Sequence, residues 1–448
     1  MSGNDTARPI THMRVLRIAA PIMISNMTVP MLGAVDTAVI GQMGETAPIG
    51  AVALGSTILT MMYWVFGFLR MGTTGLAAQA HGAGDIAERD AVLWRGLAVA
   101  AFAGSALILL QWPLGDLTLS AAGSSEEVNA LTRTYTAIRI FAAPATIAVY
   151  AISGWLIAVE RTRALLMLQL CISGFNAVFS LWFVLGLGWG VEGVALATLI
   201  AEWLGLAIGL WVCRAAVLQN VGPTARRFAD RSALRRMFSV NRDIMIRSVI
   251  LQLSITTFVF VGARFGDAEL AANQVLMQLL TIAAFALDGI SFTAESLVGQ
   301  AVGQRGAAGR GRSDHLRQAA HITILWAAGA AVLISVAFAF FGLAIIHLLA
   351  TSEELRATAQ HYLPWLIAAP ILSAAGYIFD GIFIGATMTR QMMQTMIISV
   401  AVYVLSLFIL VPGFGNHGLW AALMLLNITR GATMYYVWSR WSSSHQGI

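Results

Sequence analysis

Charged residues are scarce in this sequence, and lysine is absent from it. Only 11% of the 448 residues are charged and 58% are hydrophobic, whereas soluble proteins carry about 25% charged residues. The composition therefore excludes a globular domain with a single anchor and predicts an integral membrane protein almost throughout. All 27 basic residues are arginines, and the formal net charge is +5. Because most arginines fall in loops between apolar runs, as membrane topology requires, the positive charge does not indicate nucleic-acid binding.

Cysteine and the motifs of nucleotide and metal chemistry are also nearly missing. The two cysteines, Cys171 and Cys213, lie in apolar runs, which excludes a disulfide framework and leaves them as small buried hydrophobic residues. The sequence contains neither a GxxxxGK(S/T) motif nor a glycine-rich dinucleotide fingerprint, so we expect no ATPase within this chain. The eight histidines form no HExxH pair. We therefore expect no metal site and no cofactor.

Apolar runs of about 18 residues or more recur along the whole chain. Such runs are typical of transmembrane helices, whereas a membrane β-barrel would show short alternating segments. The predicted fold class is therefore an all-α integral membrane protein. Hydropathy places twelve spans at residues 14–41, 49–79, 91–112, 130–159, 164–187, 192–214, 239–264, 269–301, 319–349, 357–386, 391–411 and 416–438.

The second half of the chain repeats motifs of the first half in the same order. Their offset is nearly constant and close to half the length of the chain. The motif QAHG at 79–82 recurs as QAVG at 300–303, GWLIAVERTR at 154–163 recurs as GIFIGATMTR at 381–390, and GVEG at 190–193 recurs as GNHG at 415–418. Three matches in register indicate a tandem duplication of six spans.

The duplication predicts the arrangement of the two halves. An even number of spans keeps both copies in one orientation, so a pseudo-twofold axis along the membrane normal relates the two six-helix lobes. We assign residues 1–215 to the N-terminal lobe, 216–238 to a cytoplasmic linker and 239–448 to the C-terminal lobe.

Arginine is unevenly distributed between the two sets of loops. The stretches GQMGETAP, GSSEEVNA and GFGNHG contain none, and the opposite loops carry most of the arginines, with Arg133, Arg264 and Arg356 as exceptions. Because arginine-rich loops stay in the cytoplasm, we expect both termini inside the cell. A bundle of two lobes also predicts a cleft that opens to one side of the membrane at a time.

Asp36 lies near the outer end of the first apolar span. A charged group in lipid costs about 2.5–3.5 kcal/mol, so such residues normally line a cavity. Ser25 lies on the same helical face, Asn26 lies beside it, and Pro21 kinks the same helix. Because burial disfavours the charged form of a carboxylate, Asp36 is a candidate proton-coupling residue. The alternative is an aspartate that only hydrogen-bonds a neighbouring helix and fixes its register.

A second acid, Glu202, lies about ten residues into the sixth span, and Thr198 precedes it by one turn on the same face. Asn176 of the fifth span lies at a depth similar to that of Glu202, and Ser180 lies nearer the depth of Asp36. We predict that these side chains complete a polar cluster in the first lobe. The alternative is a set of local hydrogen bonds between helices.

The remaining interior charges come from four spans and group near the cytoplasmic half. Opposite charges at similar depth in a membrane are expected to pair. The group forms either an inner gate that closes or a permanent structural brace, and both interpretations stay open. Its members are Arg70, Asp288, Glu295, Asp380 and Arg430.

Seven stretches carry a family resemblance: RIAAPIMISNMTVPMLGAVDTAVIG, FLRMGTTGLAAQAHGAGD, GVEGVALATLIAEW, NRDIMIRS, ALDGISFTAESLVGQAVG, DGIFIGATMTR and GNHGLWAAL. They span nearly the whole chain, which resembles the multidrug and toxic compound extrusion (MATE) transporters and, closely, their DinF-type branch. The resemblance implies twelve helices in two six-helix lobes in a bacterial inner membrane. It also implies that an ion gradient, usually of H⁺ in this branch, drives the export of bulky amphipathic organic cations.

The resemblance also implies roles for individual residues. It makes Asp36 the proton site of the first helix, and it makes Pro21 the proline whose kink accompanies protonation. Tyr135, Asn176 and Thr198 match polar residues of the first-lobe cavity.

One position departs from the family pattern. An aspartate is common four residues after Asn176, where this chain has Ser180. The first-lobe cluster thereby loses one carboxylate, which leaves Glu202 to share the proton with Asp36 and weakens a Na⁺ site there. In the second lobe, Asp380 matches the tenth-helix acid that other branches associate with Na⁺.

The sequence as a whole predicts a secondary active exporter of amphipathic cations that works by proton antiport. We expect a monomer that contacts membrane lipid and has no nucleic-acid partner. Three alternatives stay open: Na⁺ coupling, a flippase for a lipid-linked precursor, and a membrane-embedded enzyme. A flippase predicts an arginine-lined cavity, yet most arginines lie in loops. An enzyme predicts paired catalytic groups within the bilayer, and the sequence offers no convincing pair.

Overall fold

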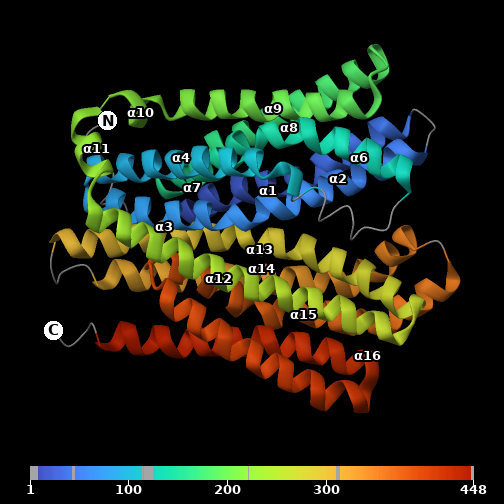
Figure 1. Cartoon of the computed structure of the whole chain (residues 1–448). Coiled ribbons are helices and arrows are strands. Elements are labelled where there is room, and N and C mark those ends of the chain that lie inside the picture. The colour runs from blue at the N-terminus through green and yellow to red at the C-terminus, as the bar shows by residue number, and fades with distance from the viewer. Residues whose placement is uncertain are drawn as a thin grey trace. The chain divides into compact units, whose positions relative to one another are not determined.

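The computed structural model describes residues 9–42, 46–113, 115, 125–219, 221–308, 313–350 and 352–444. These residues are almost entirely helical (Figure 1), which confirms the all-α class. Ten helices among them are long and apolar enough to cross a membrane. The helix α1 (His12–Gly41) is not among the ten, and α16 (Thr389–Ser444) counts once although two predicted spans fall within it.

The described chain divides into two compact units. The N-terminal unit contains Ile24–His81 and Asp85–Phe238. The C-terminal unit contains the chain up to Met23, then Gly82–Gly84, and all residues from Ser239 onward. The division therefore falls inside α1, shortly after Pro21, and the first helix contributes to both units. The predicted lobe of residues 1–215 does not separate α1 in this way.

The N-terminal unit is a bundle in which α2 packs against α6, α6 against α9, α4 against α7, and α8 against α9. Short 3₁₀ turns connect α2 to α3 and α6 to α7, and a π-helical turn follows α8. A buried apolar cluster that includes Val39, Leu59 and Val194 fills the space among α1, α2 and α9. The helices are α2 (Thr46–Trp64), α3 (Phe68–Ala83), α4 (Ile86–Leu109), α6 (Glu126–Arg139), α7 (Ala143–Ala158), α8 (Thr162–Ser180), α9 (Gly190–Val212), α10 (Arg214–Leu218) and α11 (Val221–Phe228).

The C-terminal unit is built around α15, which packs against α13, α14 and α16. Its apolar core includes Phe258 and Trp420, whose ring centroids lie 5.1 Å apart in an edge-to-face arrangement. Within α16 the backbone leaves the helical region at Gly415. The remaining helices are α12 (Arg231–Gly262), α13 (Asp267–Ala308), α14 (Ser313–Leu349) and α15 (Glu353–Gly385).

The repeat found in the sequence reappears in the helix packing of each unit. Gly154 of α7 lies so close to α3 that an added Cβ would be 2.3 Å from the carbonyl oxygen of Arg70. Gly381 of α15 approaches α13 in the same way, and its Cβ would be 2.2 Å from the carbonyl oxygen of Ser291. The two glycines open the matching motifs GWLIAVERTR and GIFIGATMTR, and the two carbonyl residues stand equally far before QAHG and QAVG. Equivalent positions of the two copies therefore make equivalent contacts.

Turn residues repeat at equivalent positions as well. Glu160 has φ 58° and Thr387 has φ 53°, and they are the two non-glycine residues with positive φ in the described chain. Gly190 and Gly415 have φ 58° and 55°. A left-handed backbone is uncommon for residues other than glycine, so its recurrence at matching positions indicates two copies of one helical unit.

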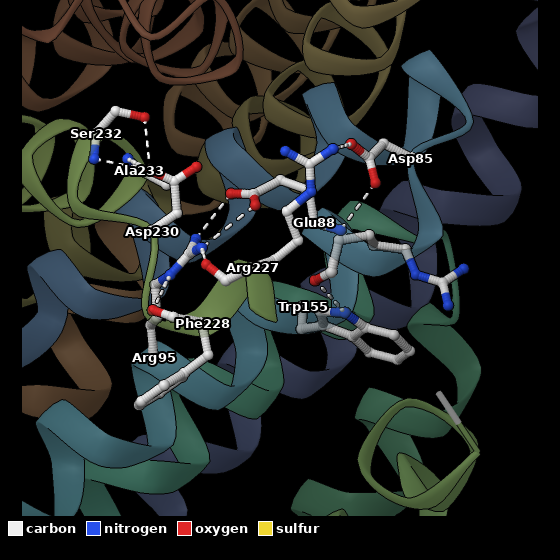
Figure 2. Close-up of polar contacts among 10 residues, drawn as sticks. Asp85, Glu88, Arg95, Trp155, Arg227, Phe228, Asp230, Ser232 and Ala233 are labelled. Atoms are coloured by element: carbon white, nitrogen blue, oxygen red, sulfur yellow. Dashed lines mark hydrogen bonds and ion pairs between the residues drawn. The ribbon is translucent and has the colours of Figure 1, made fainter. Parts of the chain in front are cut away.

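The predicted interlobe linker is itself folded, because α11 packs against α4. Arg95 of α4 is buried, and its Nη1 donates to Glu88 Oε1 at 2.7 Å. The same guanidinium donates from Nε to Phe228 O at 3.3 Å and from Nη2 to Arg227 O, at the C-terminal end of α11 (Figure 2). Arg227 pairs with Asp85 at 3.2 Å. Since a helix C-terminus favours a nearby cation, Arg95 anchors α11 to the N-terminal unit.

Candidate functional site

Two helices of the N-terminal unit surround Asp36 of α1 with hydrogen-bond donors. The Asp36 side chain is buried, with 4% exposure. Asn176 Nδ2 and Ser180 Oγ, both on α8, each donate to Asp36 Oδ1 at 3.1 Å. Thr198 Oγ1 on α9 donates to Asp36 Oδ2 at 3.2 Å. The fold therefore brings together four residues that the sequence proposed for one polar cluster, and we call them the Asp36 shell.

Helical spacing explains why the donors converge. Asn176 and Ser180 are one turn apart, so they project from the same face of α8. Asn176 Nδ2 also donates to Thr198 Oγ1 at 2.8 Å, which links the two donor helices. Directly after Ser180, α8 passes into the π-helical turn Leu181–Gly186, and such turns are frequent at functional sites. All three donors are fully buried, where low dielectric strengthens their hydrogen bonds.

The Asp36 shell can serve either protonation state of the carboxylate. An ionised carboxylate only accepts hydrogen bonds, and three donors reach Asp36. A protonated carboxyl needs an acceptor, and Asn176 Oδ1 has no hydrogen-bond partner among the described residues. The hydroxyls of Ser180 and Thr198 can also accept. The shell therefore has donors for the ionised carboxylate, and its hydroxyl groups can accept from the protonated one.

A second carboxylate and a guanidinium lie in the same unit. Glu202 follows Thr198 by one turn on α9 and is 8% exposed. Arg139, the last residue of α6, is also 8% exposed. It interacts electrostatically with both Glu202 and Asp36. The interior of the N-terminal unit thus contains two acids and one base.

The C-terminal unit has its own charge cluster around Asp380 on α15. Arg430 of α16 donates from Nη2 to Asp380 Oδ2 at 2.8 Å, and Arg247 of α12 donates from Nη2 to the same oxygen. All three side chains are buried. Asp288 and Glu295 of α13 interact electrostatically with Arg247. The expected pairing of Asp380 with Arg430 is present, and the cluster includes Asp288 and Glu295 as well.

Two arginines of these sites were absent from the expected set. Arg139 and Arg247 both fall inside long apolar helices, so the criterion that selected Asp36 applied to them equally. Arg70 belongs to the N-terminal unit rather than to the unit of Asp380. The list of interior charges in the sequence analysis therefore lacked these two arginines.

The other expected residues lie outside the Asp36 shell. Ser25 is buried on α1, but eleven helical residues separate it from the carboxylate by about 16 Å along the axis. Asn26 is half-buried beside it. Pro21 lies within α1, which is helical from His12 to Gly41. Tyr135 is fully buried on α6, and its hydroxyl has no hydrogen-bond partner among the described residues.

Metal ligands do not converge in the part of the chain that the structure describes. No three His, Cys, Asp or Glu side chains there lie close enough to hold a metal ion. Cys171 is half-buried and Cys213 is buried, and both are free thiols.

Comparison with known proteins identifies the family. The MatE family model matches residues 21–182 and 244–409. The chain belongs to the MatE family. This MatE member is 39% identical to the DNA damage-inducible protein F of Escherichia coli K12, over 94% of this chain and 91% of that protein. The expected resemblance to the DinF-type branch is thereby confirmed.

More distant relatives of this MatE member are named as drug transporters. It is 27% identical to the probable multidrug resistance protein NorM of Deinococcus radiodurans, over 66% of this chain and 64% of that protein. Its fold is similar to that of a multidrug resistance MATE family transporter solved in an outward-facing conformation. The TM-score is 0.84 at 18% identity, and the match covers 100% of this chain and 99% of the other.

Proposed function

We propose that this MatE member is a secondary active exporter that exchanges H⁺ for amphipathic organic cations. The observation that supports this most directly is the Asp36 shell, a buried carboxylate with donors from two neighbouring helices and a free acceptor at Asn176 Oδ1. The names of its relatives support the substrate class, because one is a probable multidrug resistance protein and another is a multidrug resistance transporter.

The proposed cycle uses Asp36 as the exchange site. In the outward-facing state Asp36 takes a proton, the first helix rearranges near Pro21, and the cation leaves. On the cytoplasmic side Asp36 loses the proton and a new cation binds. Antiport requires that each ligand weakens the binding of the other. A cation near Asp36 stabilises the carboxylate, and protonation removes that attraction, so the coupling has the correct sign.

The proposed architecture has twelve transmembrane helices in two six-helix lobes related by a pseudo-twofold axis along the membrane normal. The lobes are residues 1–215 and 239–448, with 216–238 as the linker. To the ten spans we add α1, and we divide α16 at Gly415. A single crossing needs about 20 residues, whereas the candidate span within α16, Thr389–Ser442, is 54 residues long. We further propose a monomer in a bacterial inner membrane with both termini in the cytoplasm.

The two charge clusters favour H⁺ over Na⁺ as the coupling ion. Asp380 already accepts from Arg247 and Arg430, so a metal cation there would compete with two guanidinium groups. In the N-terminal unit the Asp36 shell offers one carboxylate surrounded by donors. The same contacts weigh against a lipid phosphate at this cluster, because Arg247 and Arg430 are both engaged by Asp380.

Proteoliposomes with an imposed pH gradient test the proposal. The wild-type protein should move a fluorescent cationic dye in Na⁺-free buffer, and each uptake should be accompanied by H⁺ movement in the opposite direction. Asp36→Asn should abolish gradient-driven movement while dye binding persists. Asp267→Asn, an exposed acid at the start of α13, is the matched control and should behave as wild type. Equal transport by Asp36→Asn and wild type would remove Asp36 from the coupling role.

A further inference from the structure

Three aromatic side chains form a hydrogen-bonded chain at one end of the C-terminal unit. His361 and Trp365 lie one turn apart on α15, so they project from the same face of that helix. His417 lies in α16, shortly after the backbone break at Gly415. Trp365 Nε1 donates to His417 Nδ1 at 2.9 Å, and His417 Nε2 lies 2.9 Å from His361 Nε2. We call Trp365, His417 and His361 the histidine cluster.

The indole of Trp365 fixes the position of every ring proton in the histidine cluster. An indole N–H can only donate, so His417 Nδ1 must be an unprotonated acceptor. A neutral imidazole carries its proton on the other nitrogen, so His417 Nε2–H donates to His361 Nε2. His361 in turn carries its proton on Nδ1. The contacts therefore hold both histidines neutral, each in one tautomer.

A further proton cannot enter the cluster without breaking one of its two hydrogen bonds. On His417 the proton would occupy Nδ1 and oppose the N–H of Trp365. On His361 it would occupy Nε2 and oppose the N–H of His417. His417 could accept there only by moving its own proton to Nδ1, again against Trp365. Since an unperturbed histidine takes up a proton near pH 6.5, mildly acidic solution opens the cluster.

Among the described residues, no acid lies against the cluster to pair with an added proton. His361 is exposed and His417 is half-buried, so both are within reach of solvent. The titratable contact on α15 is Tyr362, whose ring centroid lies 4.8 Å from that of His417 and 5.0 Å from that of His361. His361 acts electrostatically on His417, whereas the charged residues at the adjacent helix ends do not. These residues are Arg264, Asp267, Glu269, Glu353, Glu354 and Arg356.

Asn416 anchors the same stretch of α16 to a different helix. Its side chain is buried and exchanges two hydrogen bonds with Asn273 of α13, at 2.8 and 3.0 Å. Trp420 Nε1 also donates to Asn273 Oδ1, at 2.8 Å. Amide and indole groups do not titrate, so this anchor is independent of pH. The segment after Gly415 thus has one anchor on α13 that acid leaves intact and one on α15 that acid breaks.

We propose that the histidine cluster is a second proton-binding site, which releases α15 from α16 when either of its histidines takes up a proton. It shares no residue with the Asp36 shell and lies in the C-terminal unit. The inference goes beyond the proposed function and does not depend on transport. The arginine distribution predicts that this end of the unit lies outside the cell, so the site responds to external pH.

Thermal unfolding in detergent tests the site at about pH 7.5 and about pH 5, which bracket the ordinary histidine pKa of about 6.5. Only the folded state loses a hydrogen bond on protonation, so the unfolded state binds the proton more readily and stability falls in acid. The melting temperature of wild type should fall by about 2–4 °C more than that of His417→Asn, which keeps an amide oxygen for Trp365 and cannot titrate. His347→Gln, at an exposed histidine of α14, is the matched control and should behave as wild type.

Trp365→Phe separates this mechanism from ordinary histidine titration. Without the indole N–H, His417 Nδ1 can hold an added proton while Nε2–H still donates to His361. The two rings then share the proton, and the extra fall of the melting temperature in acid should disappear. Ring-nitrogen NMR of protein with ¹⁵N-labelled histidine follows the same change. His417 Nδ1 should be unprotonated at neutral pH in wild type, and in acid the two rings should stay hydrogen-bonded only in Trp365→Phe.

Three kinds of result would overturn the proposal. Equal falls of wild type and His417→Asn would show that the cluster does not respond to acid. An equal fall of Trp365→Phe and wild type, or a protonated Nδ1 on His417 at neutral pH, would show that the indole does not fix the protons. Stabilisation of wild type but not of His417→Asn by Zn²⁺ at neutral pH would make the pair a metal site instead. If Trp365→Phe fails to fold, the NMR spectra of wild type decide. Failure of proton antiport through Asp36 would leave all of these results unchanged.

Discussion

Replacing Asp380 by asparagine should strongly destabilise the C-terminal unit. Arg247 and Arg430 both donate to Asp380 Oδ2, and their side chains are only 5% and 3% exposed. Without the carboxylate, the two buried guanidinium groups would lose the acid that both of them contact, and Asp288 and Glu295 would be the acids that still act on Arg247. Removing one partner of a buried ion pair costs about 3–5 kcal/mol. Because one acid here serves two bases, we expect Asp380→Asn to fall at the upper end of that range.

A second and a third variant separate charge from packing. Arg247→Met keeps a one-to-one pair of Asp380 with Arg430, so it should unfold at a temperature close to that of wild type. The double variant Asp380→Asn/Arg247→Met leaves one buried guanidinium without its acid contact instead of two, so it should be more stable than Asp380→Asn alone. Thermal unfolding in detergent, followed by the fluorescence of the 13 tryptophans, measures this order. Equal melting of Asp380→Asn and wild type would refute the reasoning.

The same variants decide between a brace and a gate. A permanent brace predicts that Asp380→Asn loses stability and still transports dye below its melting temperature. An inner gate predicts the opposite, altered transport with little loss of stability. The burial of all three side chains and the two contacts to a single oxygen favour the brace.

Three further predictions rest on single contacts. Gly381→Ala places a Cβ 2.2 Å from a carbonyl oxygen of α13, so it should destabilise the folded protein by about 1–3 kcal/mol. Gly329→Ala is the control, because an added Cβ there has nothing within 4 Å. Equal melting temperatures of the two variants would contradict the packing. Ser180→Asp puts a second acid beside Asp36; since two adjacent carboxylates resist joint ionisation, the midpoint of dye binding should move toward alkaline pH. Hydrogen bonds from Ser232 lower the pKa of Asp230. Asp230 therefore contributes stability at neutral pH that is lost as the pH falls below about 4. The free energy of unfolding of Asp230→Ala should accordingly fall less than that of wild type between neutral and acid pH.

Membrane class, helix positions and the internal duplication were predictable from the sequence. The transfer of a segment into lipid depends on the composition and hydropathy of that segment alone, so spans can be predicted without knowing which helices pack against them. The nearly constant offset between the repeated motifs likewise lies in the chain itself. The duplication reappears at Gly154 and Gly381 in packing and at Glu160 and Thr387 in backbone conformation.

The residues of the Asp36 shell were predictable as candidates, because a charged or polar group in an apolar span is costly unless it has a partner. Their convergence was only partly predictable. Depth along a span follows from residue number, so Ser180 was expected near the level of Asp36. Ser25 was also expected on the Asp36 face, yet its distance along α1 keeps it out of the shell.

The tertiary structure decided which charges meet. Hydropathy leaves the rotation of each helix about its axis undetermined, and that rotation selects the contacts. It directs Arg247 onto Asp380 together with Arg430, and it directs the donors of α8 and α9 onto Asp36. The sequence by itself therefore determined the membrane helices, the internal duplication and which acids lie within apolar spans. Only the packing of helices against one another determined which base compensates each acid.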